Sequence, residues 1–312
     1  MHQSPSSNSD FQHPPLWQAR GRGVHITRPL VIAILNVTPD SFSDGGRHQT
    51  IDAAVEGARQ MIAEGADGID VGGESTRPQG AKTVSTAEEL RRVIPVVRAL
   101  REGFPGALLS IDTTKSEVAE AALGEGADIV NDVSGFRIDP RMGEIAAAAR
   151  AGVILMHSRG SVSEMGTYQH ATYGDDVVGE IVAEVQASVA SALAAGVSSE
   201  SIVIDPGIGF AKRSEHSLRV LAELPRFVTL GLPILVGVSR KRFVGELSGV
   251  NRAEDRVAGT VGANVAALMR GARLFRVHDV APNREALDVA WGILQAGDAT
   301  AVDSRFPIHD SR

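Results

Sequence analysis

Eight short apolar segments recur along the 312-residue chain, and each of them ends at or leads into a polar or charged residue. Nearly continuous runs of Val, Ile and Leu are typical of parallel strands that are buried on both faces. In an eight-stranded α/β barrel the site lies at the carboxyl ends of the strands, so this one pattern predicts both a fold and the place of its site. The segments are 31–35, 68–71, 108–111, 128–130, 153–156, 201–204, 233–236 and 274–275.

Segments with helical spacing of apolar residues separate the predicted strands. One of them, 86–100, starts with Ser85 and Thr86 and carries two glutamates in its first turn, which indicates a capped helix. Strict alternation of strands and helices requires a parallel sheet with right-handed crossovers. Eight such units predict an α/β fold with a single (β/α)8 TIM barrel and a parallel eight-stranded core. The alternative is an open doubly wound sheet, in which Asn36 and His278, from the first and last strands, would lie far apart.

The two ends of the chain differ from its regular middle part. Residues 1–20 are rich in Ser, Pro, Asn and Gln, and we expect them to form a flexible N-terminal tail. Residues 21–297 form the predicted barrel domain. Residues 298–312, in which the apolar period is lost, form the predicted C-terminal tail. A hydrophobic content of 43% is ample for the core of one domain of this length.

The composition argues against several functional classes. A formal charge of −7 is unlike that of a nucleic-acid-binding protein, although cations that converge locally can still bind an anion. The lack of cysteine rules out disulfides, thiolate zinc sites and a thiol nucleophile. No apolar stretch approaches the roughly 20 residues of a membrane span, and residues 1–10 lack the apolar core of a secretory signal. We therefore expect a cytoplasmic protein without nucleic-acid or membrane partners.

Three residues with acceptor oxygens follow predicted strands: Asp112, Asn131 and Asp205. Each by itself is a common helix cap or turn former at such a junction. Around one barrel mouth, two carboxylates and an amide suit a flat heterocycle with several N–H donors, because a carboxylate pairs bidentately with an amino-pyrimidinone edge. Phe210 offers a stacking face after the glycines that follow Asp205. Lys241 adds a cation for a ring carbonyl or nitrogen, although a basic cluster of this kind is more often simply solvated.

A second set of residues suits an anion. Asn36, Arg77, Arg276 and His278 end or follow the first, second and eighth predicted strands, which are neighbours in a closed barrel. Arg276 and His278 alternate along one strand and so point to the same side. Surface charge for Arg77 and a structural role for His278 are the ordinary alternatives. Convergence on one phosphate or pyrophosphate accounts better for all four.

Five motifs, in chain order, resemble those of the dihydropteroate synthase family. The motifs are NVTPDSFSDGG at 36–46, GGESTRP at 72–78, DPGIGF at 205–210, VSRK at 238–241 and RVHDV at 276–280. The resemblance spans residues 30–295 and is very specific. It implies a homodimeric (β/α)8 barrel enzyme of folate biosynthesis that is the target of sulfonamides. Such a transferase joins 6-hydroxymethyl-7,8-dihydropterin pyrophosphate to p-aminobenzoate with Mg²⁺ present, and gives 7,8-dihydropteroate and pyrophosphate.

The resemblance also implies a role for each matching residue. The pterin site would comprise Asp112, Asn131, Met156, Asp205, Phe210 and Lys241. The pyrophosphate site would comprise Asn36, Arg77, Arg276 and His278, with Asn36 also a ligand of Mg²⁺. The p-aminobenzoate site would comprise Phe42, Thr76, Pro78, Phe210 and Ser239. The residues that would stabilise the charges separating in catalysis are Asp112, Asp205, Lys241, Arg276 and His278.

The sequence departs from the family pattern at Thr114, Ser158, Ala211 and Arg213, and the loop after Pro78 is one residue longer than expected. Ala211 and that loop border the implied amine pocket. Two other functions stay open. One is a pterin-binding methyltransferase domain, with the same barrel and carboxylates, and the other is a non-catalytic relative that binds pterin pyrophosphate without condensing it. Release of pyrophosphate from the two substrates distinguishes all three.

Overall fold

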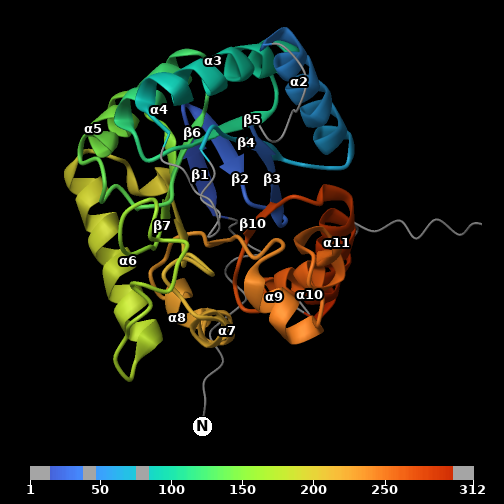
Figure 1. Ribbon diagram of the computed structural model, residues 1–312. Helices are drawn as coiled ribbons and strands as arrows, with labels where there is room; N and C mark the ends of the chain where they lie inside the picture. The colour runs from blue at the N-terminus through green and yellow to red at the C-terminus, as the bar shows by residue number, and fades with distance from the viewer. Residues whose placement is uncertain (1–14, 38–46, 75–83, 298–312) are drawn as a thin grey trace, which may run out of the picture.

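The computed structural model describes residues 15–37, 47–74 and 84–297, and eight parallel strands form a closed barrel (Figure 1). The strands are β3 (Leu30–Asn36), β4 (Gly68–Gly72), β5 (Leu108–Asp112), β6 (Ile129–Asp132), β7 (Gly152–Met156), β8 (Ile202–Asp205), β9 (Leu235–Val236) and β10 (Leu274–Val277). They are parallel and ordered β8-β7-β6-β5-β4-β3-β10-β9. A parallel bridge between Ile204 and Ile234 joins the two outer strands. The predicted TIM barrel is confirmed, and the alternative of an open sheet is excluded.

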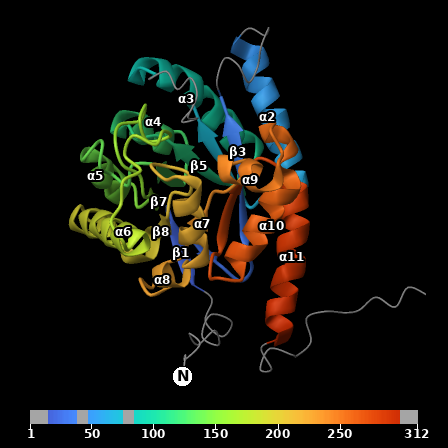
Figure 2. The ribbon, with the colours of Figure 1, turned by 60° about the horizontal axis from the view of Figure 1, so that its bottom comes forward.

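Helices form an outer ring around these strands, with a helix in every crossover (Figure 1). The helices are α2 (Arg47–Ala63), α3 (Thr86–Gly103), α4 (Ser116–Gly124), α5 (Arg141–Ala148), α6 (Val177–Ala194), α7 (Ser214–Ala222), α8 (Pro225–Val228), α9 (Arg242–Ser248), α10 (Val257–Leu268) and α11 (Val280–Gly297). Two short 3-10 turns, η2 (Ser199–Ser201) and η3 (Ala253–Asp255), precede β8 and α10. Figure 2 shows α11 beside α10, and α11 also contacts β3, which completes the ring.

The helix ends show how local sequence sets the crossovers. The predicted cap of α3 is confirmed, because the Ser85 hydroxyl oxygen accepts a hydrogen bond from the Glu88 backbone N–H at 3.3 Å. Asp176 caps α6 in the same way, at 3.0 Å from a backbone N–H of the first turn. The basic cluster at Lys241 leads directly into α9. That helix ends at Gly249, whose φ of 74° lies in the left-handed region that favours glycine.

The barrel wall separates two cores. Successive residues of a strand point to opposite sides of the sheet. In β3, Val31 and Leu35 belong to the large cluster between the sheet and the helices, whereas Leu30 and Ile32 belong to a second cluster around the barrel axis. The other strand residues of this axial cluster are Leu108, Ile129, Ile154, Val203, Leu235 and Leu274. Apolar side chains therefore fill the amino-terminal half of the interior, as expected for this fold.

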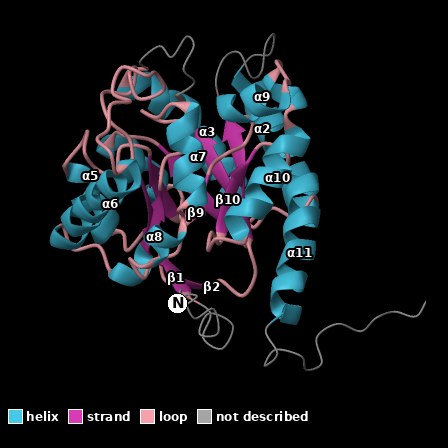
Figure 3. Ribbon diagram, turned by 90° about the horizontal axis from the view of Figure 1, so that it is seen from below, coloured by secondary structure: helices cyan, strands magenta, loops and turns pink. Residues whose placement is uncertain are grey.

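An antiparallel hairpin of β1 (Leu16–Ala19) and β2 (Arg22–His25) closes the amino-terminal end of the barrel (Figure 3). Trp17 is fully buried in the axial cluster, and its indole N–H donates to the Ser201 carbonyl at 2.9 Å. The prediction of a tail up to residue 20 is therefore wrong for residues 16–20. The polar composition of residues 1–20 predicted a tail, but a single residue, Trp17, anchors the hairpin. A buried indole contributes a large apolar area and one hydrogen bond.

Among the described helices, α6 is long and apolar enough to cross a membrane by length and composition alone. This corrects the expectation that no segment meets that test. Ile181 and Val185 of α6 are buried in the core around the barrel, while Glu180 and Glu184 form ion pairs with Arg159. The contacts of α6 are thus those of a helix in the outer ring.

Candidate active site

A cavity of about 670 Å³ lies at the carboxyl-terminal end of the barrel, a size typical of small-molecule sites. Every described residue that the sequence predicted for the site lines it: Asn36, Asp112, Asn131, Met156, Asp205, Phe210, Ser239, Lys241, Arg276 and His278. The other predicted site residues, Phe42, Thr76, Arg77 and Pro78, lie outside the described residues. The closed barrel therefore brings the acceptor set and the described part of the anion set to one mouth.

The pleat of the strands explains why polar side chains gather there. Along β5, the axial positions change from a leucine through Ser110 to Asp112. The register of the sheet pairs Asp112 with Asn131 and Met156 with Asp205. Because all eight strands are parallel, their last axial residues all lie at the same end of the barrel, around the mouth.

Arg276 joins the two residue sets that the sequence suggested. Its Nε donates to Asp70 Oδ2 at 2.6 Å, and its Nη2 donates to Asp112 Oδ2 at 2.7 Å. The Asn131 side-chain amide donates to the same Asp70 oxygen at 3.0 Å. Burial alone would lower the pKa of Arg276, but the two aspartates raise it above its usual value. The guanidinium is thus held among the carboxylates of the expected pterin site, where its charge offsets theirs.

Burial moves the pKa values of the cavity residues toward neutrality. It raises the pKa of Asp112 to about 7, against the opposing effect of Arg276. It raises the pKa of Asp205 to about 6 and lowers the pKa of Lys241 to about 8. Asp205 and Lys241 each oppose the shift of the other. Titratable groups shifted in this way inside a cavity are typical of functional sites.

The turn after β8 forms one wall of the cavity. Asp205 Oδ1 accepts a hydrogen bond from the Gly207 backbone N–H at 2.7 Å, which orients the carboxylate. Phe210 packs against a small apolar cluster that contains Met156. Lys241 Nζ lies 3.7 Å from the centre of the Phe210 ring, a cation–π contact. A flat ligand can therefore meet a carboxylate, a cation and an aromatic ring within one pocket.

The loops after β9 and β10 are tied together near the mouth. The Ser239 hydroxyl oxygen accepts a hydrogen bond from the His278 backbone N–H at 3.1 Å and lies 3.0 Å from His278 Nδ1. The Arg240 guanidinium donates to Asp279 at 2.6 and 3.0 Å. These contacts fix Ser239, expected near the amine, beside His278, expected near the pyrophosphate.

Among the described residues, no three His, Asp or Glu side chains gather as a metal site. Asn36, the residue predicted as a Mg²⁺ ligand, lines the cavity, and its amide oxygen and Asp112 lie beside Gly72. An amide oxygen is a suitable donor for Mg²⁺, which often has few protein ligands and is completed by waters and substrate phosphates. Asn36 therefore fits a Mg²⁺ ion that is held mainly by the substrate.

Sequence reasoning missed the roles of three buried polar residues. Asp70 is fully buried within β4, and the available signal was a charged residue inside an otherwise apolar strand. Lys212 is 1% exposed, and its Nζ lies 2.7 Å from Nδ1 of His157, which is also buried. His157 follows the apolar segment 153–156, so the sequence marked its position, but nothing indicated Lys212 as its partner, because the two residues come from different crossovers.

The comparisons with known proteins agree with this geometry. Residues 32–278 match the family described as Pterin binding enzyme. The chain is 45% identical to a dihydropteroate synthase of Synechocystis sp. over 87% of this chain and 92% of the relative. It is 47% identical to that of Mycobacterium leprae over 86% and 94%. The structure of the Xanthomonas albilineans enzyme with 4-aminobenzoic acid is 45% identical, with a TM-score of 0.83 over 91% of this chain and 99% of that one. This chain therefore belongs to the dihydropteroate synthase family of pterin-binding enzymes.

Proposed function

We propose that this chain is a dihydropteroate synthase. It joins the methylene carbon of 6-hydroxymethyl-7,8-dihydropterin pyrophosphate to the amine nitrogen of p-aminobenzoate, and releases 7,8-dihydropteroate and pyrophosphate. The observation that carries this proposal is the single cavity lined by every described residue of the expected site. A solved relative in complex with 7,8-dihydropteroate, 42% identical and with a TM-score of 0.79, supports it.

The pterin ring is bound in the part of the cavity that carries the acceptor oxygens. Its ligands are Asp112, Asn131, Met156, Asp205, Phe210 and Lys241. Asp205 is 4% exposed and oriented by the Gly207 N–H. Each carboxylate oxygen has two lone pairs, so this bond leaves Asp205 able to accept from two ring donors.

The pyrophosphate is bound by residues around β3 and β10, together with Mg²⁺. These residues are Asn36, Arg77, Arg276 and His278. When bound, Mg²⁺ offsets the negative charge of the leaving group. Arg276 is fixed by Asp70 and Asp112 before substrate arrives, so its positive charge needs little reorganisation during the reaction.

The p-aminobenzoate lies against the turn after β8 and the start of the loop after β9. Its pocket comprises Phe42, Thr76, Pro78, Phe210 and Ser239, of which the last two are described in the structure. Phe210 thus contributes to both the pterin and the amine pockets, which brings the two reacting atoms together.

The reaction breaks the C–O bond between the pterin methylene and pyrophosphate, and the bonding electron pair leaves with pyrophosphate. The pterin ring delocalises the resulting positive charge, which Asp112 and Asp205 stabilise. The amine lone pair then forms the C–N bond, and the nitrogen loses its proton to solvent or to the released pyrophosphate. Arg276 and His278 stabilise the charge that grows on the leaving group. A neutral aromatic amine is already nucleophilic, so this scheme needs no strong general base.

We further propose that the enzyme is a homodimer. Val289 and Ile293, one helical turn apart on α11, are 61% and 64% exposed, and Met269 at the end of α10 is 50% exposed. Adjacent exposed apolar side chains are typical of subunit interfaces. We also propose one pterin-binding domain that ends with α11, and a cytoplasmic location, for which composition is the support.

A pyrophosphate assay tests the proposed function. With pterin pyrophosphate and Mg²⁺ supplied, we expect pyrophosphate release to depend on p-aminobenzoate, and 7,8-dihydropteroate to appear in equal amount by mass spectrometry. Binding of pterin pyrophosphate without release would indicate the non-catalytic relative. Pterin binding without pyrophosphate chemistry or any requirement for p-aminobenzoate would favour the methyltransferase alternative.

Asp205→Asn tests the pterin site in particular. The substitution replaces a charged acceptor by an amide, so we expect the dissociation constant of 6-hydroxymethylpterin to rise at least about tenfold, while amine binding changes little. Isothermal titration calorimetry measures both. Asp139→Asn is the matched control, because Asp139 caps the first turn of α4, where it accepts from the Ser116 N–H, and does not line the cavity. An unchanged pterin dissociation constant in Asp205→Asn would contradict the assignment.

A further inference from the structure

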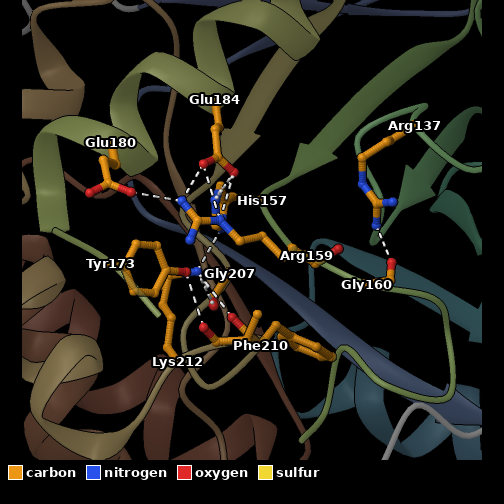
Figure 4. Close-up of polar contacts among 12 residues, drawn as sticks. Arg137, His157, Arg159, Gly160, Tyr173, Glu180, Glu184, Gly207, Phe210 and Lys212 are labelled. Atoms are coloured by element: carbon orange, nitrogen blue, oxygen red, sulfur yellow. Dashed lines mark hydrogen bonds and ion pairs between the residues drawn. The ribbon is translucent and has the colours of Figure 1, made fainter. Parts of the chain in front are cut away.

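Lys212 is almost fully buried and lines the cavity beside Phe210, which lies two residues before it in the chain (Figure 4). Its Nζ has three acceptors within hydrogen-bond distance: the Gly207 and Phe210 carbonyl oxygens, both at 3.1 Å, and His157 Nδ1 at 2.7 Å. An ammonium group has three N–H donors and no acceptor. The environment therefore matches the protonated lysine, with one donor for each acceptor.

This contact fixes the tautomer of His157. Because the ammonium group only donates, Nδ1 carries a lone pair, and the ring proton is on Nε2. Nε2 donates to Glu184 Oε2 at 3.0 Å, and Arg159 binds the same carboxylate (Figure 4). Burial and the charge of Lys212 lower the pKa of His157 to about 4, which keeps the ring neutral. Glu184 and Arg159 thus orient an imidazole whose acceptor nitrogen points at Lys212.

The turn that Lys212 holds is difficult to form without support. Gly207, Gly209 and Ala211 have φ angles of 69°, 77° and 47°, all in the left-handed region. For a residue with a Cβ, such as Ala211, this conformation costs roughly 1–2 kcal/mol. A Cβ at Gly207 would lie 1.9 Å from the His157 carbonyl oxygen, so the turn packs directly on the end of β7. Hydrogen bonds to its carbonyls, including one from the Tyr173 hydroxyl to Ala211 at 3.0 Å, hold this conformation.

We propose that Lys212 is a positioning residue for p-aminobenzoate: its ammonium group, with neutral His157 as acceptor, holds the turn that places the Phe210 ring. The proposal rests on the proposed role of Phe210 as a wall of the amine pocket. Lys212 acts through two backbone carbonyls, because its three donors are all engaged by acceptors of the protein itself. Lys241 depends on the same placement, since it lies over the Phe210 ring.

Lys212→Met tests the proposal by removing all three donors from an unbranched side chain. We expect the KM for p-aminobenzoate to rise about tenfold and the pterin dissociation constant to rise less, by about threefold, because the pterin keeps its contacts with Asp112, Asn131 and Asp205. Arg101→Met is the matched control. Arg101 also donates to backbone carbonyls, those of Gly126 and Ala107, but at the amino-terminal end of the barrel. A folded Lys212→Met protein with the wild-type KM would overturn the proposal.

A pair of substitutions at His157 decides the question even if Lys212→Met does not fold. The asparagine side chain places an amide oxygen near the position of Nδ1 and can accept from Lys212, whereas leucine cannot. We expect His157→Asn to keep the KM for p-aminobenzoate within about threefold of wild type, and His157→Leu to raise it about tenfold. Equal KM values in the two variants would show that the ring acts by volume alone and would overturn the proposal.

The pH profile gives a readout that simple destabilisation would not change. Burial lowers the pKa of Lys212 to about 7. The amine formed above that pH has one donor fewer, so the wild-type KM for p-aminobenzoate should rise above pH 7, and this rise should be missing in Lys212→Met. The titratable or charged groups around Lys212, present in both proteins, are His157, Arg159, Tyr173, Glu184, Asp205, His216 and Lys241. Parallel profiles in the two proteins would contradict the proposal.

Phe210→Ala separates this proposal from the one on which it rests. If Phe210→Ala leaves the KM for p-aminobenzoate unchanged, the proposed role of Phe210 is wrong, whatever Lys212 does. If Phe210→Ala raises the KM and folded Lys212→Met does not, the role of Phe210 stands and only the role of Lys212 fails.

Discussion

The two halves of the barrel interior are built on the same strands and have opposite contents. The amino-terminal half is filled by the apolar cluster around Trp17 and Ile32, and the hairpin covers it from below. The carboxyl-terminal half carries Asp70, Asp112, Asn131, Asp205 and Arg276. One step of two residues along a strand moves a side chain from the first region to the second. The comparison teaches that stability and chemistry occupy adjacent layers of one barrel.

Burial of the charged side chains in the polar half opposes folding. Asp70, Asp112 and Asp205 lose most of their hydration. Pairing with Arg276 and Lys241 offsets only part of this loss of hydration free energy. The apolar half and the outer core must therefore supply the stability that the site does not. Substitutions in the two halves should then have different effects. Those in the apolar half should lower the free energy of unfolding at every pH, whereas those in the polar half should change ligand binding and the pH dependence of stability.

The largest expected effect is that of Trp17→Ala in the apolar half. Removing the buried indole and its hydrogen bond to Ser201 should lower the free energy of unfolding by about 3–5 kcal/mol. Denaturant titration measures this loss, and steady-state kinetics at low temperature should give kcat/KM within about twofold of wild type. A large fall in kcat/KM of the folded protein would show that the hairpin end of the barrel also shapes the site, and would contradict the contrast between the two halves.

A smaller effect, opposite in sign, is expected for Asp205→Asn in the polar half. Burial raises the pKa of Asp205 from 3.8 to about 6. Between these pH values Asp205 is protonated in the folded protein but ionised in the unfolded chain. The contribution of Asp205 to the free energy of unfolding is therefore highest below pH 3.8 and falls as the pH rises through 6. The asparagine variant lacks this fall. Its unfolding free energy relative to wild type should therefore grow by about 2 kcal/mol between pH 4 and pH 7. Denaturant titration at both pH values measures this, with Trp17→Ala, whose offset should stay constant, as control. A constant offset in both variants would refute the contrast.

The smallest effects are expected for conservative substitutions of two isoleucines on either side of the boundary between the halves. Ile32 and Ile34 lie two residues apart on β3 and face the same side, but Ile34 lines the cavity and Ile32 belongs to the apolar cluster. Ile32→Val should cost about 0.5–1.5 kcal/mol of stability and leave kinetics unchanged. Ile34→Val should cost less stability and change the KM for the pterin substrate severalfold. If both variants behave alike, the two layers are not functionally distinct.

The sequence predicted those parts of the molecule that depend on local pattern. Asn36 ends β3 and His278 follows β10, and these strands are hydrogen-bonded neighbours, as the barrel prediction required. Residues defined by long-range partners were missed. The ion pair of Asp70 with Arg276 spans 206 residues, so the charge inside an apolar strand indicated a buried partner but not which residue that partner is. The hairpin escaped prediction for the same reason, since Trp17 finds its acceptor 184 residues later.

This separation along the chain has a consequence for folding during synthesis. The carbonyl that receives the hydrogen bond of the indole is made 184 residues after the indole itself, roughly 10–40 s later at ordinary rates of translation. During this interval the nascent chain exposes Trp17, and the amino-terminal end of the forming barrel exposes its apolar side chains. The hydrogen bond that anchors the hairpin can therefore form only after Ser201 has been made, and factors that shield nascent chains can cover the indole until then.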